Sequence, residues 1–286
     1  MLAMTSDFHG DNRKSTDIKE VLANIARAGF SHVHWCHEWT GSYVYSVYEM
    51  LQIKEWCGEA GLAVKGVHAS SGESGADLKD YVSSNEYNRL AGLELIKNRV
   101  DLAHVLDAET IVLHLDPPWQ RFEAEKDYRE RFYRYVQKSF DELESYCKTR
   151  RIRVCVENSC IPLNHAHDMF DTLFARYDGD YLGLCFDTGH ANIACWDNCL
   201  DFADCYNDRL FMIHIHDNQG EKDEHLLPYA GTFNWEGFAP VLARSPYRFP
   251  VLVESNTRDP DHAAWLEKAF ALGSRFAEAV EKARQR

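Results

Sequence analysis

Short hydrophobic runs alternate along this chain with longer segments in which hydrophobic residues recur every three or four positions. The short runs are rich in β-branched and aromatic residues and predict strands, whereas the longer spacing is typical of amphipathic helices. The predicted strands lie at residues 2–6, 32–38, 63–70, 110–116, 153–159, 181–190, 210–217 and 249–256. Eight strands separated by helical patterns predict an α/β fold of the TIM (β/α)8 barrel type, with a large open α/β sheet as the alternative.

The length of the chain suits one barrel. Its 286 residues are close to the roughly 250 that a TIM barrel usually needs. No segment rich in Pro, Gly or Ser interrupts the alternation, so the sequence shows no linker between two domains. We therefore expect a single TIM-barrel domain over residues 1–286.

Composition and charge limit the kinds of partner that we expect this protein to bind. The chain carries 45 acidic and 31 basic residues, a formal net charge of −14, which opposes attraction to nucleic acid or to anionic lipid. No apolar run approaches the roughly 20 residues that cross a bilayer, and the first residues do not resemble a signal peptide. The nine cysteines include no CxxC pair, and their odd number favours reduced thiols. We expect a cytoplasmic protein without a nucleic-acid or membrane partner.

Alternation within the predicted strands assigns side chains to the inside or the outside of the barrel. In the segment MIHIHD, Ile213 and Ile215 share one face, which leaves His214 and His216 on the other. The same interpretation of six strands turns one carboxylate or imidazole inward near each C-terminal end, where barrel enzymes carry their active sites. We expect one site made of His68, His114, Glu157, Asp187, His214 and Glu254.

Three of these six side chains are carboxylates, which would repel one another unless protons or a cation neutralised them. Glu157, Asp187, His214 and Glu254 offer three oxygen ligands and one nitrogen. This set suits Mn²⁺, Mg²⁺ or Co²⁺, and also Zn²⁺. The sequence therefore predicts one divalent metal ion at these four residues, with open positions for substrate oxygens.

Seven strings follow one another along the chain: VHAS, LHLD, VENS, CFDTGHANI, IHIHD, DEHLLPYAGTFNW and LVESN. In this order they resemble the strand-end motifs of the xylose isomerase-like barrel superfamily. That superfamily contains isomerases and epimerases of sugars and sugar phosphates, together with AP endonucleases of the endonuclease IV type. The DTGH string and the spaced Glu, Asp, His, Glu series are the specific elements. The resemblance covers nearly the whole chain from residue 60 onward and implies a xylose isomerase-like TIM barrel.

The resemblance also implies a reaction. In sugar epimerases of this superfamily, a single divalent metal is held by the residues that match Glu157, Asp187, His214 and Glu254. The two glutamates are also implicated in proton transfer, so one would remove a proton next to a ketose carbonyl and the other would return it. The metal would stabilise the intervening enediolate. The resemblance thus implies a sugar or sugar-phosphate isomerase or epimerase with Glu157 and Glu254 as catalytic residues.

Further side chains near the strand ends are expected to contact a small sugar substrate. His190 resembles a group that polarises a substrate oxygen, and His225 is expected to reach back over the metal. Many relatives carry lysine in place of His216, which we interpret as a substrate contact or a rim histidine, and the missing lysine argues against a phosphorylated substrate. Aromatic candidates are Trp35, His37, Trp39, Trp119 and Trp196; such rim residues can also form subunit contacts, which leaves a homo-oligomer open. The predicted substrate contacts are His68, His114, His190, His216, His225, Trp35 and Trp119.

The sequence leaves three alternative functions open. Endonuclease IV-like phosphodiesterases use three zinc ions, and the residues of this chain in matching motifs are His68, His114, Glu157, Asp187, His190, His214, Asp223, His225 and Glu254. The net charge of −14 and the absence of basic residues from the segments DFHGDN and HEWTGSYVYS argue against a DNA substrate. A lyase or dehydratase acting on a keto-polyol is the second alternative. A non-catalytic ligand-binding barrel is the third, although a binding protein would not need both glutamates.

Overall fold

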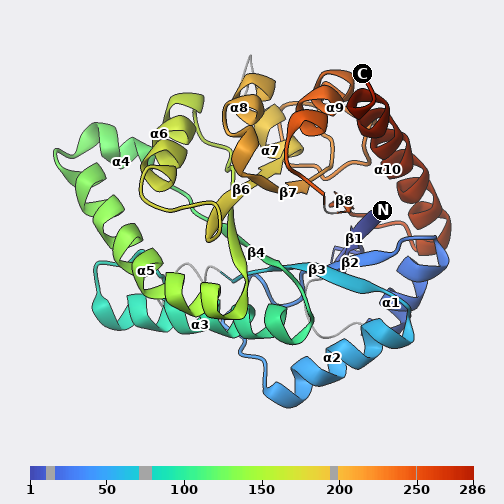
Figure 1. Cartoon of the computed structure of the whole chain (residues 1–286), viewed down its shortest axis with the longest axis horizontal. Helices are drawn as coiled ribbons and strands as arrows, with labels where there is room; N and C mark the ends of the chain where they lie inside the picture. Colours follow the sequence, from blue (N-terminus) through green and yellow to red (C-terminus); the bar gives the residue numbers. More distant parts are fainter. Residues whose placement is uncertain (11–16, 71–78, 194–198, 249) are drawn as a thin grey trace.

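A single parallel sheet forms the centre of the protein. The computed structural model describes residues 1–10, 17–70, 79–193, 199–248 and 250–286. Eight strands pair in the order β7-β6-β5-β4-β3-β2-β1-β8 (Figure 1). They are β1 (Leu2–Thr5), β2 (His32–Trp35), β3 (Ala63–His68), β4 (Thr110–His114), β5 (Arg153–Glu157), β6 (Leu182–Asp187), β7 (Leu210–His214) and β8 (Val251–Val253). The predicted barrel of alternating strands and helices is confirmed.

The sheet joins its two edges just beyond the end of β7. Ile215 forms an isolated parallel bridge with Val253. Its N–H donates to Leu252 O at 2.9 Å, and its carbonyl accepts from the N–H of Glu254 at 3.0 Å. These bonds close the ring, so the alternative of an open sheet is wrong.

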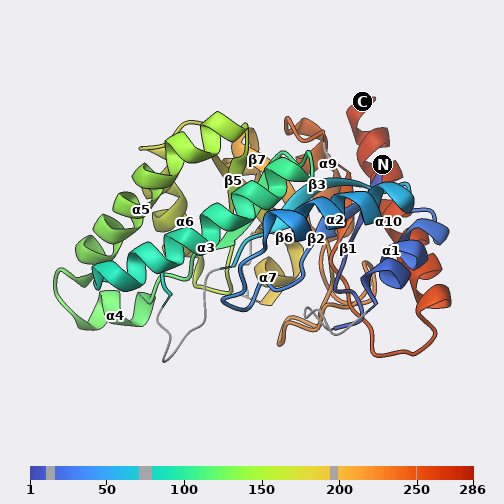
Figure 2. The ribbon, with the colours of Figure 1, turned by 90° about the horizontal axis from the view of Figure 1, so that it is seen from below.

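Helices cover the outside of the ring. They are α1 (Ile18–Arg27), α2 (Val47–Glu59), α3 (Glu86–Val105), α4 (Trp119–Ala124), α5 (Tyr128–Arg150), α6 (Leu163–Phe174), α7 (Thr188–Ile193), α8 (Cys199–Cys205), α9 (Trp235–Arg244) and α10 (His262–Arg284), with a 3-10 turn at Asn207–Arg209. Figure 2 shows α3, α2 and α1 side by side along one flank of the strands. The last helix, α10, packs beside α1 and β1, so the beginning and the end of the chain meet on the wall of the barrel (Figure 1). None of the helices in the described part of the chain is both long and apolar enough to cross a bilayer.

The alternation of side chains divides the core into two parts. Residues of one parity pack outward into the large layer between strands and helices, as Ile111 and Leu113 do. Residues of the other parity form a small interior cluster of Ala3, Val112, Cys155, Cys185, Met212 and Leu252. The interior is tightly packed beneath the mouth, which is the open end of the barrel at the C-terminal ends of the strands. A Cβ on Gly66 would lie 2.6 Å from Nδ1 of His34. The next inward-facing residue of each strand, two positions further along the chain, therefore lies at the mouth of the barrel.

The predicted strands are longer than the observed ones and extend past the last residues that pair with a neighbouring strand. The largest change in type concerns residues 181–190, because β6 ends at Asp187 and helix α7 starts at the next residue. The Asp187 carboxylate causes this switch, since Oδ1 accepts the N–H of His190 at 2.7 Å and so caps the first turn of α7. Residue 249, the predicted start of the eighth strand, lies outside the described residues.

Candidate active site

The C-terminal ends of the strands bring the six strand-end side chains together. Five of them are the last residues of β3 to β7, and the sixth directly follows β8. Neighbouring strands are in register at this level, with His114 opposite Glu157 and Asp187 opposite His214. The cluster consists of His68, His114, Glu157, Asp187, His214 and Glu254. It lies at the end of the barrel where βα loops can build an active site.

Four of these side chains converge on one point. Each of Glu157, Asp187, His214 and Glu254 has a ligating atom within 4.8 Å of those of the other three. His214 Nδ1 lies 2.6 Å from Glu254 Oε2, 3.3 Å from Glu157 Oε1 and 3.9 Å from Asp187 Oδ2. We call these four residues the quartet. Glu254 is partly exposed and the other three are buried, so the quartet opens to solvent on the Glu254 side.

The quartet contains buried polar atoms that protein groups do not satisfy. Among the described residues, neither ring nitrogen of His214 nor Oε2 of Glu157 makes a hydrogen bond of acceptable geometry. Buried polar atoms nearly always have a partner, so these atoms point to an ion as theirs. A divalent cation would also neutralise the three carboxylates. The residues therefore fit a divalent metal, and the four members of the quartet could serve as its ligands.

Histidines hold Glu157 in its charged form. His114 Nε2 lies 3.0 Å from Glu157 Oε2, and His190 Nδ1 lies 3.3 Å from Glu157 Oε1. Burial by itself would raise the pKa of Glu157, but the charges of His214 and His114 and the close approach of the His114 and His190 rings keep this pKa well below its usual value. Glu157 is therefore a carboxylate, the form that a metal ligand requires.

One wall of the mouth is made by aromatic rings. The ring of Trp39 lies 4.4 Å from that of His68 and 5.4 Å from that of His114, measured between centroids. Burial, together with the neighbouring His114, lowers the pKa of His68 to about 3, so this imidazole is neutral. His68, His114 and Glu157 also form a group whose ligating atoms lie within 4.8 Å of one another. This wall thus combines nitrogen donors with a flat apolar face.

His190 lies on α7 between the quartet and the loop that follows β7. Its Nδ1 contacts the carbonyl of Asn158 at 3.0 Å. Because a carbonyl can only accept, Nδ1 carries a hydrogen. Its Nε2 lies 3.4 Å from Asp223 Oδ2. Burial opposes protonation of His190, but Asp187, Asp223 and Glu157 outweigh burial and raise its pKa well above the usual value.

The loop after β7 contains a carboxylate whose role is structural. Asp217 is buried and accepts hydrogen bonds from the N–H groups of Asn218 (2.9 Å) and Phe233 (3.1 Å) and from Nε1 of Trp235 (2.8 Å). It also forms an antiparallel bridge with Leu226. Asp217 therefore fixes both ends of the loop, so that the residues between them can reach the site.

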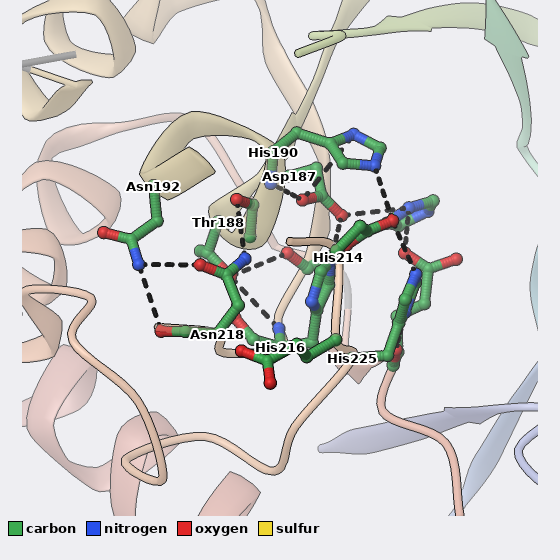
Figure 3. A network of polar contacts seen from close by, with 12 residues as sticks. Asp187, Thr188, His190, Asn192, His214, His216, Asn218 and His225 are labelled. Atoms are coloured by element: carbon green, nitrogen blue, oxygen red, sulfur yellow. Dashed lines mark hydrogen bonds and ion pairs between the residues drawn. The ribbon is translucent and has the colours of Figure 1, made fainter. Parts of the chain in front are cut away.

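His225 returns from this loop to the quartet (Figure 3). Its Nδ1 lies 2.7 Å from the carbonyl of Glu254, and its Nε2 lies 3.0 Å from Asp223 Oδ2. Burial lowers the pKa of His225, but the hydrogen bond with Asp223 and the charge of Glu254 outweigh burial and raise it to about 10. The structure thus places His225 beside the quartet.

The predicted aromatic contacts need correction. Trp35 belongs to the outward parity of β2, and its fully buried ring packs among the helices, where Nε1 donates to the hydroxyl of Tyr45 at 3.1 Å. It therefore cannot contact a ligand in the mouth. Trp119 is partly buried at the start of α4 and stacks on His165 with 5.6 Å between ring centroids. The structure places neither tryptophan on the six strand-end residues, and Trp196 lies outside the described residues.

The prediction for His216 also changes. Its side chain is fully buried rather than placed at the rim, and Nε2 lies 3.0 Å from Asp187 Oδ2. The same nitrogen lies 3.8 Å from Asp223 Oδ1, so two carboxylates already surround it. The prediction of a substrate contact is therefore replaced by a contact with Asp187.

Two inward residues were missed by the sequence analysis. Asp7 follows the inward parity of β1 and lies close to Glu254, His225 and Trp39, and burial, together with the charge of Glu254, raises its pKa to about 6. His34 follows the inward parity of β2, is buried, and lies 5.3 Å from His214 between ring centroids. The sequence does contain the signal for these two residues, because the alternation of side chains assigns inward positions in β1 and β2 as it does in the other six strands.

Comparison with protein families identifies the family of this chain. Residues 22–275 match the model of the xylose isomerase-like TIM barrel family, so the chain belongs to that family. The uncharacterized protein y4fM of Sinorhizobium fredii (strain NBRC 101917 / NGR234) is 31% identical over 291 residues, which cover 94% of this chain and 91% of that protein.

Solved structures share the fold at low sequence identity. A D-tagatose 3-epimerase-like protein superposes with a TM-score of 0.73 at 20% identity and covers 99% of both chains. The 3-keto-D-glucoside 4-epimerase YcjR from E. coli gives 0.68 at 18% identity, over 96% of this chain and 100% of the other. The IOLI protein with a bound zinc atom gives 0.67 at 13% identity over 98% of both chains. This fold therefore occurs in sugar epimerases and in a protein that binds a divalent metal.

Proposed function

We propose that this protein is a divalent-metal-dependent enzyme that epimerises or isomerises a keto-sugar by proton transfer. The observation that carries the proposal is the position of two glutamates around His214 Nδ1, Glu157 at 3.3 Å and Glu254 at 2.6 Å. Two carboxylates at one metal-competent point provide both ligands and proton carriers. Membership of the family and the fold shared with sugar epimerases support this choice of reaction.

The residues at the mouth of the barrel would have different roles in this reaction. When bound, the metal supplies a Lewis acid that stabilises negative charge on the substrate oxygens. Glu254, the more exposed glutamate, would take the proton from the carbon next to the carbonyl. The returned proton would come from His114, which lies 3.0 Å from Glu157 and would pass its proton to the Glu157 carboxylate, so that Glu157 delivers it to the carbon and returns to its charged form. Return to the opposite face of the same carbon gives epimerisation, and return to the neighbouring carbon gives isomerisation.

The metal site leads to a direct prediction. We expect one divalent ion per chain after the protein is stripped with a chelator and reloaded with Mn²⁺, because the quartet has one convergence point. His214→Ala should weaken Mn²⁺ binding by about 100-fold or more, since it removes the only nitrogen of the quartet. Metal analysis after equilibrium dialysis measures the binding, and anomalous scattering from a crystal soaked with Mn²⁺ locates the ion.

The matched control is His104→Ala, because His104 is an exposed histidine on α3. This variant should bind Mn²⁺ like the parent protein. The metal proposal fails if the quartet stays empty at saturating Mn²⁺, Co²⁺ and Zn²⁺, or if the ion is held elsewhere.

One observation favours a second candidate, a zinc phosphodiesterase of the endonuclease IV type. The nine matching residues, together with His216, meet in overlapping groups: His68, His114 and Glu157; Asp187, His190 and His216; His216, Asp223 and His225; and the quartet. Clusters of several metal ions suit phosphoryl transfer. The net charge of −14 opposes binding to a polyanion, and for this reason we place the sugar enzyme first.

Two assays separate these candidates. We expect turnover of at least one free ketose from a panel of pentuloses and hexuloses, because the proposed site needs only vicinal oxygens and a carbonyl. We expect no detectable binding or cleavage of an abasic-site duplex with Zn²⁺ at physiological salt, because the acidic chain does not neutralise phosphates. Product analysis by NMR distinguishes an epimer or isomer from the dehydrated product of a keto-polyol dehydratase. Catalytic incision of the duplex together with inactivity on every sugar would contradict the proposal, and inactivity in both assays would favour a non-catalytic barrel.

A further inference from the structure

His216 occupies an unusual position for a histidine near the mouth of the barrel. Its side chain has no exposed surface, and its Nε2 points toward Asp187 (Figure 3). The Nε2 atom of His216 lies 3.0 Å from Asp187 Oδ2. Since a carboxylate accepts hydrogen bonds, Nε2 carries a hydrogen and donates it to Asp187.

This contact completes the orientation of the Asp187 carboxylate. The other oxygen, Oδ1, accepts the N–H of His190 at 2.7 Å, and the Asp187 N–H donates to Asn158 Oδ1 at 2.7 Å. Both carboxylate oxygens are thus engaged from outside the quartet. With both held, Oδ2 remains 3.9 Å from His214 Nδ1 and keeps lone pairs for a cation.

The backbone around His216 leaves its ring little freedom. The Thr188 hydroxyl donates to the carbonyl of His216 at 2.6 Å and accepts the His216 N–H at 3.1 Å. Gly189 provides the space for the ring, because a Cβ at that position would lie 1.9 Å from Cε1 of His216. The start of α7 and the segment just after β7 therefore lock together around this imidazole.

The other face of the ring supports His225. The two imidazoles are nearly parallel, with 4.1 Å between centroids and 9° between planes. His225 in turn contacts the backbone carbonyl of Glu254 at 2.7 Å. One buried ring thus connects Asp187 on β6 with the segment that carries Glu254 after β8.

We infer that His216 is a positioning residue for the metal site, which holds Asp187 in the orientation of a ligand through Nε2 and supports His225 through its ring face. The inference rests on the metal site of the proposed function. The partners of ligating groups orient those groups before the ion arrives, and loss of such a partner typically weakens metal binding by about 10- to 100-fold. His216 would thus tune metal affinity without touching the ion or the sugar.

Two variants separate the hydrogen bond from the ring. His216→Phe keeps a flat ring for His225 but cannot donate to Asp187, so we expect the Mn²⁺ dissociation constant to rise by about 10- to 100-fold. His216→Gln places an amide N–H close to the position of Nε2, so it should restore affinity to within about threefold of the parent. Isothermal titration with Mn²⁺ measures the dissociation constant, and circular dichroism checks that each variant is folded.

The outcomes are separable from those of the metal proposal. Absence of Mn²⁺ binding in the parent protein would contradict the metal site itself. Parent-like affinity in folded His216→Phe would contradict the inference while leaving the metal site intact, and so would equal losses in the Phe and Gln variants. If the Phe variant does not fold, His216→Asn, which is smaller and too short to reach Asp187 Oδ2, should show the same 10- to 100-fold loss.

Discussion

Replacing Glu254 by glutamine is expected to lower kcat for the ketose substrate by about 10²- to 10⁴-fold at saturating metal. Glutamine has nearly the same shape, but it cannot accept the substrate proton. The side chain of Glu254 is the most exposed of the quartet, with 14% of its surface accessible, so it is the glutamate that a ligand in the mouth reaches first. Steady-state kinetics at saturating Mn²⁺ measures the loss, and metal analysis of the same samples confirms occupancy.

The control for this variant is Glu267→Gln, because Glu267 is an exposed glutamate on α10. It should keep the parent kcat. In D₂O, turnover by the parent protein should place deuterium on the carbon next to the carbonyl, because the removed proton exchanges with solvent. Full activity of folded Glu254→Gln would contradict the assigned role, and a product without deuterium would indicate a hydride shift instead.

Replacing Asp217 by asparagine is expected to lower the free energy of unfolding by about 3 kcal/mol. The Asp217 carboxylate accepts three hydrogen bonds in a buried position, including one from Trp235 Nε1 at 2.8 Å. Asparagine keeps one acceptor oxygen but turns an NH₂ group toward at least one of these donors, so a buried N–H loses its partner. Urea denaturation monitored by tryptophan fluorescence measures the change.

Asp208→Asn is the matched control, because 84% of the Asp208 side chain is exposed and its nearest cation, Arg209, lies 4.0 Å away. We expect a change within about 0.5 kcal/mol. An Asp217→Asn variant as stable as the parent would show that the loop after β7 does not depend on this carboxylate. Because the Asp217 carboxylate is bonded to Asn218, Phe233 and Trp235 and not to the quartet, folded Asp217→Asn should retain tight binding of Mn²⁺ if the loop keeps its position.

Much of the site followed from the parity of the strands. Alternation predicted that Glu157, Asp187 and His214 face the inside of the barrel. In the structure all three are buried, and each is the last residue of its strand. Parity can make such predictions because a strand reverses the direction of its side chains at every residue. The same argument, extended to β1 and β2, would have included Asp7 and His34.

The loops were beyond this reasoning, because their backbone has no fixed period. Trp35 and Trp39 belong to one segment of sequence, and both are aromatic. The parity of β2 turns Trp35 outward, but only the structure shows that Trp39, in the loop after β2, covers His68. A loop is positioned by contacts with distant residues: Arg99 on α3 donates to the carbonyls of Tyr43 (3.0 Å) and Glu38 (2.8 Å).

By itself, the sequence determined that eight strands alternate with helices and that a row of acidic and imidazole side chains ends them, because hydrophobic periodicity is a local property of the chain. Only the tertiary structure decided which of these side chains share one point and which support them. His216 shows the difference: its parity agrees with that of His214, yet a glycine on α7 and a ring from a loop bury it against Asp187. The distances between strands, and the packing of loops over them, depend on residues far apart in the chain, and no local pattern contains them.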